Sequence, residues 1–161
     1  SSAVKCLIRY LRESQVDAVS TTGTPHNIHL TGLGLKRVLD VKWIADFRDP
    51  WTDIDFYAQL KLTRSADAKH KRLEGEVLRE ADKVLTVSWH WAEDLRKLGA
   101  PNVEVVTNGY DPDDLPSPPE PVDDDFSLVH IGSLSPTRNA PELWKSLKLS
   151  LIHISEPTRP Y

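Results

Sequence analysis

The sequence lacks several features that would place it in other classes of protein. It has one cysteine, Cys6, which excludes an intramolecular disulfide and is predicted to be a small buried residue of the first helix. Its formal net charge is −4, whereas a nucleic-acid-binding domain is usually basic, so we expect no nucleic-acid partner. No apolar run is long enough to cross a membrane and no signal peptide opens the chain. We therefore expect a cytoplasmic protein, for which peripheral contact with the inner face of the cell membrane stays open.

Metal-binding and phosphate-binding motifs are also missing. His26 and His29 are three residues apart, but no cluster of Cys or His completes a metal site, so we predict none. We expect His29 to make a hydrogen bond at a helix end. His26 faces the mouth of a predicted cleft and is a candidate for ligand contact. The phosphate-binding pattern GxxxxGK[ST] does not occur.

Apolar segments with strand character alternate with segments of helical periodicity. Strands are predicted at residues 16–21, 42–46, 83–88 and 103–107, and helices at 1–14, 26–40, 65–81 and 89–99. The strands are apolar throughout, which is typical of parallel strands covered on both faces. Thr24 is the expected N-cap of the second helix and Gly99 the glycine that ends the fourth. The charged side chains of the helices are expected to face solvent. With right-handed crossovers, this alternation predicts an α/β fold with a Rossmann-like, doubly wound parallel sheet.

A change of composition divides the chain. Residues 111–125 contain five of the twelve prolines among acidic residues and are predicted to form an extended linker. The linker separates a first domain, residues 1–110, whose first strand we expect to be missing, from the start of a second domain at 126–148. Residues 149–161, LSLIHISEPTRPY, look like a translated sequencing-library adapter and are left out of the fold prediction.

Four loops follow predicted strands, at residues 22–27, 46–53, 88–91 and 108–111. The carboxyl ends of parallel strands meet at one edge of a sheet, where α/β proteins bind ligands. We therefore expect these loops to converge on one cleft.

The loop DFRDPWTD combines four ionisable side chains with two aromatic rings. In a structural interpretation, Arg48 pairs with Asp46 or Asp49 to brace the loop, and Trp51 fills the core. In a functional interpretation, Asp49 accepts hydrogen bonds from ligand hydroxyls and Arg48 binds a phosphate or carboxylate, while Trp51 or Phe47 stacks on a ring. Spacing alone does not separate the two, but a position at the cleft favours function.

The stretch IGSLSPTRN, residues 131–139, follows a further apolar segment. Gly132 allows close backbone approach, and Arg138 precedes a helix whose N-terminus attracts anions. The stretch is a candidate diphosphate cradle, with an ordinary strand-to-helix turn as the alternative.

These segments, in this order, resemble a bacterial glycosyltransferase of family 4. The resemblance runs from about residue 16 to residue 147 and depends on the blocks DFRDPW, TNGYD and HIGSLSPTRN taken together. It implies a two-domain GT-B fold, in which the N-terminal domain mainly binds the acceptor and the C-terminal domain mainly binds a nucleotide-sugar. Transfer then occurs in the cleft between the domains, usually with retention at the anomeric carbon and without a bound metal. No cofactor is implied beyond the nucleotide-sugar itself.

The resemblance also implies roles for matching residues. Arg48 and Asp49 become the candidate catalytic residues. The substrate-binding candidates are Asp46, Trp51, His26, Asn108 and Gly109. The loop that faces the donor phosphates is matched by Gly132, Ser133 and Arg138. Arg138 would neutralise charge on the departing nucleoside diphosphate.

The sequence departs from the family pattern at three places. Many relatives carry a histidine where this chain has Phe47-Arg48-Asp49, so no role of that histidine is carried over. The family's glycine-rich first loop and its paired-glutamate donor motif do not occur in the sequence. We therefore expect these 161 residues to be an inactive piece of a larger enzyme.

The function expected of the parent protein is transfer of a sugar from a nucleotide-sugar to a glycan or lipid-linked acceptor, in envelope or exopolysaccharide assembly. Two alternatives stay open: a GT-B nucleotide-sugar epimerase, and a non-catalytic nucleotide- or sugar-binding α/β module. A downstream domain with paired glutamates would favour transfer.

Overall fold

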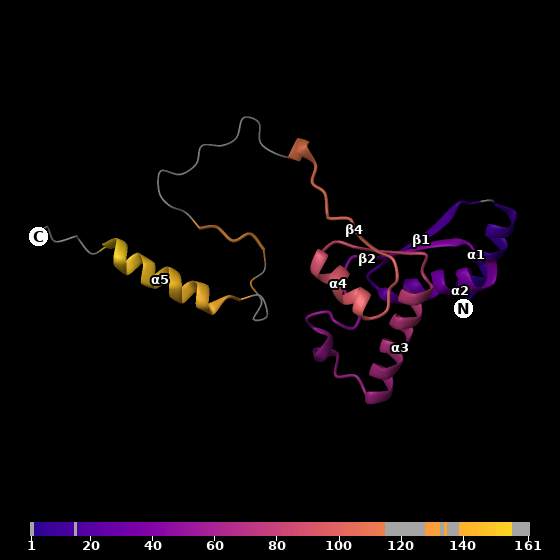
Figure 1. Ribbon diagram of the computed structural model, residues 1–161, viewed down its shortest axis with the longest axis horizontal. Helices are drawn as coiled ribbons and strands as arrows, with labels where there is room; N and C mark the ends of the chain where they lie inside the picture. Colours follow the sequence, from indigo (N-terminus) through magenta and orange to yellow (C-terminus); the bar gives the residue numbers. More distant parts are fainter. Residues whose placement is uncertain (1, 15, 115–127, 133, 135–138, 156–161) are drawn as a thin grey trace, which may run out of the picture. The chain divides into compact units, whose positions relative to one another are not determined.

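The computed structural model describes residues 2–14, 16–114, 128–132, 134 and 139–155 (Figure 1). The chain divides into two compact units, Ser1–Leu115 and Pro116–Tyr161. The second unit contains the helix α5, Pro141–Ser155, which runs through the start of the adapter-like segment. Most of the predicted linker lies outside the described residues.

The first unit is built on a four-stranded parallel sheet. Its strands are β1 Ala18–Gly23, β2 Lys42–Phe47, β3 Lys83–Thr86 and β4 Val103–Val105, and they lie side by side in that order. The register pairs Thr21 with Ala45, Ala45 with Val84 and Val84 with Val103. The predicted Rossmann-like α/β fold with a parallel sheet is therefore confirmed.

Helices connect and cover these strands. They are α1 Ser2–Glu13, α2 His29–Leu39, α3 Arg64–Glu80 and α4 Trp89–Lys97, with short 3-10 turns η1 His26–Ile28, η2 Tyr57–Leu60 and η3 Pro112–Asp114. Each strand is added on the same side of the one before it, so right-handed crossovers place α2, α3 and α4 on the same face of the sheet (Figure 1).

Burial in the strands alternates as a result. Trp43, Ala45 and Phe47 of β2 point toward the helices and are at most 1% exposed, whereas Ile44 and Asp46 between them are half-buried. The expectation that both faces are covered therefore does not hold within residues 2–114. The reason is that each described strand joins the same edge of the sheet. Helices cover the second face only where the chain returns to the opposite edge and adds strands there.

Trp43 fixes how closely α2 approaches the sheet. Its indole Nε1 donates a hydrogen bond of 2.9 Å to Thr21 Oγ1 on β1. The ring lies directly beneath Gly32 of α2, where an added Cβ would come within 2.2 Å of the indole Nε1. Only a residue without a side chain fits there. Glycine lowers helix stability, but at position 32 it is required for α2 to pack on the sheet.

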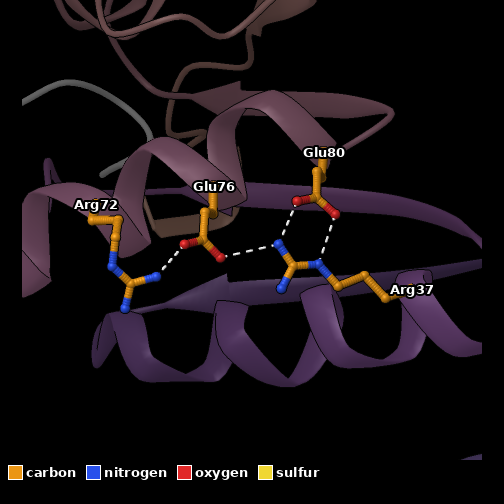
Figure 2. Close-up of polar contacts among 4 residues, drawn as sticks. All are labelled: Arg37, Arg72, Glu76 and Glu80. Carbon is orange, nitrogen blue, oxygen red and sulfur yellow. Dashed lines mark hydrogen bonds and ion pairs between the residues drawn. The ribbon is translucent and has the colours of Figure 1, made fainter.

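Charged side chains hold α2 against α3 at the surface. Figure 2 shows Arg37 of α2 bonded to Glu80 through Nε at 2.9 Å and through Nη2 at 2.5 Å, and to Glu76 at 3.0 Å. Arg72 of α3 bonds Glu76 from the other side. The Arg37 guanidinium holds the pKa of Glu76 and of Glu80 below the usual value. Because the two arginines are exposed and the two glutamates are partly exposed at the surface, salt screens the network and its contribution to stability is small.

Helix ends agree in part with the sequence. Gly99 has φ of 105° just after α4, as expected of a terminating glycine. Thr63 caps α3, because its hydroxyl accepts a hydrogen bond from the amide of Ala66. The prediction that Thr24 caps the second helix is wrong: the N-cap of η1 is Pro25, and the Thr24 hydroxyl bonds elsewhere. Cys6 is exposed on α1 rather than buried.

We expect Gly32→Ala to lower the free energy of unfolding by about 1–3 kcal/mol, because overlap with the Trp43 indole outweighs the roughly 1 kcal/mol that alanine gains over glycine in a helix. Urea denaturation measures this. The matched control is Gly34→Ala on the same helix, whose Cβ would lie 3.2 Å from Val4 of the terminal helix α1. Val4 can shift, so this loss should be smaller. A Gly32→Ala variant as stable as the wild type would contradict the packing argument.

Candidate functional site

A polar hollow lies where β1 and β2 end. It encloses about 270 Å³ and is lined by Gly23, Thr24, Arg48, Asp49 and Asn108. Arg48 and Asp49 follow β2, Thr24 follows β1, and Asn108 lies beyond β4. Three of the predicted site residues, Arg48, Asp49 and Asn108, therefore meet in one place because parallel strands end at one edge.

The two charges of this polar hollow differ in their partners. Asp49 Oδ2 accepts a hydrogen bond of 3.1 Å from the Thr24 hydroxyl, which ties the loops after β1 and β2 together. Arg48 is exposed, and it forms no ion pair with Asp46, Asp49 or any other residue that the structure describes. The structural interpretation in which Arg48 braces its own loop is therefore wrong.

A second, aromatic hollow shares Thr24 with the first. It encloses about 280 Å³, and its walls are almost entirely apolar. Its lining residues are Thr24, Pro25, His26, Asn27, Trp51, Ile54, Phe56, Tyr57, Leu60 and His70. The predicted candidates His26 and Trp51 belong to this hollow rather than to the polar one.

Aromatic rings are layered at the boundary between the aromatic hollow and the core. The His26 ring lies parallel to Trp51, with centroids 5.6 Å apart and planes 16° apart, and His29 stacks on Phe47 at 4.5 Å. Gly23 makes room for this layer, since a Cβ there would come within 2.7 Å of His29 Nε2 and 2.9 Å of His26 Nδ1. Trp51 is thus both a core residue and a wall of the hollow.

His29 is fully buried and bound to the sheet. Its Nδ1 lies 2.9 Å from Thr21 Oγ1, which also accepts the Trp43 indole hydrogen. The expected hydrogen bond is present, but it goes to a strand rather than to a helix end. Burial lowers the pKa of His29 to about 4, with a smaller contribution from the nearby His26. The ring is therefore neutral near pH 7 and suited to accept at Nδ1 the proton of the Thr21 hydroxyl.

His26 is half-buried, and neither of its ring nitrogens meets hydrogen-bond geometry with the described residues. Burial lowers its pKa, and the Pro50 carbonyl and the Asp49 carboxylate oppose this in part. Its role in the wall is therefore that of a neutral aromatic ring.

Helix α3 braces the loop that follows β2. Glu74 is 2% exposed and accepts hydrogen bonds from the Thr52 hydroxyl at 2.6 Å and from the Thr52 amide at 3.3 Å. One turn earlier, His70 Nδ1 accepts the Trp51 indole hydrogen at 3.2 Å. Burial raises the pKa of Glu74 against the effect of these bonds. The expectation that the charged side chains of this helix face solvent is wrong for Glu74.

The remaining candidates lie elsewhere. Asp46 is half-buried within β2, which extends one residue beyond the predicted strand, and it does not line either hollow. Gly109 follows Asn108 in an open stretch, where a Cβ would meet no atom within 4 Å. Gly132, in the second unit, has φ of 131°, a conformation that favours glycine. Ser133 and Arg138 lie outside the described residues.

Two other features are absent from the described residues. No group of three or more His, Cys, Asp or Glu side chains in that part of the chain is arranged to hold a metal ion. No helix there is long and apolar enough to cross a membrane.

Comparison with known proteins supplies the family. A family model described as Glycosyltransferase Family 4 matches residues 2–114, which include the whole sheet and both hollows. The chain therefore belongs to glycosyltransferase family 4. No curated protein and no solved structure gives a significant match.

We expect the stability of the protein to depend on pH through His29. Since its folded pKa is about 4 and the unfolded value is 6.5, the stability that the neutral ring contributes is present above pH 6.5 and is lost as pH falls toward 4. His29→Asn keeps an acceptor for Thr21 but does not titrate. The difference in unfolding free energy between wild type and variant should shrink from about pH 7 to about pH 4.5, measured by urea denaturation. A difference that is constant with pH would show that His29 is not buried in neutral form.

Proposed function

We propose that this member of glycosyltransferase family 4 forms the acceptor side of a sugar-transfer site, and that its parent enzyme moves a sugar from a nucleotide-sugar to a glycan or lipid-linked acceptor with retention at the anomeric carbon. The observation that carries the proposal is the convergence of Arg48, Asp49 and Asn108 on the polar hollow at the strand ends. Membership of the family supports transfer as the reaction class.

The chemistry of the polar hollow suits an acceptor that carries hydroxyls and negative charge. Asp49 is an acceptor-only group held in place by Thr24, so it can orient a nucleophilic hydroxyl. Arg48 offers a planar set of donors to a phosphate or carboxylate. Asn108 adds an amide that can donate to or accept from a sugar hydroxyl.

The donor side belongs to the second unit in this proposal. Gly132, Ser133 and Arg138 contact the phosphates of the nucleotide-sugar, and Arg138 stabilises the charge that develops on the departing diphosphate. No metal or cofactor takes part. We further propose that the enzyme acts in the cytoplasm in polysaccharide assembly, and that the 161-residue chain alone does not catalyse transfer.

Substitution of Asp49 tests the acceptor side. In the full-length parent, Asp49→Ala should lower kcat/KM for transfer by about a hundredfold or more, because a misplaced nucleophile loses most of the gain from orientation. The assay supplies a panel of radiolabelled nucleotide-sugars and the glycan and lipid fractions of the source organism. The matched control is Asp53→Ala, which removes an exposed carboxylate of the same loop that lines neither hollow. Wild-type turnover in Asp49→Ala, with the fold intact by circular dichroism, would remove this loop from the site.

Substitution of Arg138 tests the donor side. Arg138→Ala in the full-length parent should weaken binding of uridine or guanosine diphosphate by about tenfold or more, because a charge-assisted contact to phosphate is lost. Calorimetry measures the affinity. Arg64→Ala, which removes a charge from the first turn of α3, is the control. Unchanged affinity in Arg138→Ala would refute the diphosphate cradle.

A further inference from the structure

The aromatic hollow is a separate part of the site, with its own chemistry. It adjoins the polar hollow through Thr24, whose hydroxyl is engaged with Asp49. A molecule that reaches Asp49 with one end can therefore enter the aromatic hollow with the other. The aromatic hollow does not orient the acceptor hydroxyl, so the part of the acceptor that occupies this hollow has to be identified separately.

Three hydrogen-bond donors of its walls are already engaged by the protein, the first being the Thr24 hydroxyl, which is bonded to Asp49. The Trp51 indole hydrogen is bonded to His70 at 3.2 Å, and the Tyr57 hydroxyl is bonded to Asp67 at 3.2 Å. The ring nitrogens of His26 are buried away from the surface. Apart from the Asn27 amide, these walls offer few partners to the hydroxyls of a sugar ring, and a buried hydroxyl without a partner is costly. An alkyl chain would lose nothing by contact with the same walls.

The mouth of the hollow carries exposed apolar side chains that an alkyl chain would cover. Phe56 and Leu60 are 45% and 49% exposed, although both are large and hydrophobic. Covering them removes apolar surface from water, which is favourable. The size also fits: a space of about 280 Å³ holds roughly nine groups of the size of a water molecule, which is close to an eight-carbon chain.

From these observations we infer that the acceptor is an amphiphile, whose alkyl chain occupies the aromatic hollow while its phosphate or hydroxyl head lies in the polar hollow. This inference depends on the proposed function, and among the acceptors considered there it selects the lipid-linked class. The occupant is a single chain of a small amphiphile, since the hollow is too small for a protein segment with side chains.

The test compares two phosphates that differ only in their tail. Octyl phosphate, kept below its micelle concentration, and methyl phosphate are titrated into the 161-residue chain by calorimetry. Octyl phosphate should bind at least about tenfold more tightly, because its tail buries apolar surface. Leu60→Ser and Phe56→Ser should reduce this ratio toward one. Val38→Ser, which removes an exposed apolar side chain from α2 outside both hollows, should leave the ratio unchanged.

The outcomes separate the inference from the proposed function. Equal affinity for the two phosphates, absence of binding by either, or a ratio that survives both Leu60→Ser and Phe56→Ser overturns the alkyl site. Arg48→Ala should weaken the binding of both phosphates by a similar factor, so that the ratio of the two affinities stays the same. If Arg48→Ala binds methyl phosphate as tightly as the wild type does, the head group does not lie in the polar hollow and the proposed acceptor site fails, whatever the ratio.

Discussion

The hydrogen-bonded series from Trp43 through Thr21 to His29 sets the spacing between the sheet and α2. All three side chains are buried, and each nitrogen–oxygen distance in the series is 2.9 Å. The indole occupies the space that Gly32 leaves free, so α2 cannot move closer without overlapping the ring, and it cannot move away without breaking the buried contact between His29 and Thr21. This spacing brings His29 over Phe47 and leaves His26 at the sheet edge, where the two hollows open.

The loop after β2 combines rigidity with exposed charge. Thr52 and Trp51 are held from α3 by Glu74 and His70, and Asp49 is held from the neighbouring loop by Thr24. Within this one short loop, the aromatic side chains therefore pack against the protein and the charged side chains face the solvent. Sites of this kind work well on rigid supports, because the side chains are already placed before a ligand arrives.

Sequence reasoning reached the convergence of Arg48, Asp49 and Asn108 because strand positions follow from local apolar patterns and parallel strands end at one edge. It missed Glu74 and His70, because two polar residues four apart on a charged helix look the same whether they face water or a loop. The loss of Asp46 from the site has a similar cause. The sequence predicts Asp46 both as the last strand residue and as the first loop residue. Because β2 continues through Phe47, Asp46 lies inside the strand, and strand ends are the least predictable part of the pattern.

The Asp49 carboxylate adds little to affinity by itself. The Thr24 hydroxyl is bonded to Oδ2, so an acceptor hydroxyl replaces either that hydroxyl or a solvent molecule at Oδ1. In both cases one hydrogen bond to the carboxylate replaces another of the same kind, with little net gain in free energy. Asp49 therefore sets the orientation of the acceptor hydroxyl more than the binding affinity. The affinity for the acceptor then comes from the walls of the two hollows on either side of Asp49.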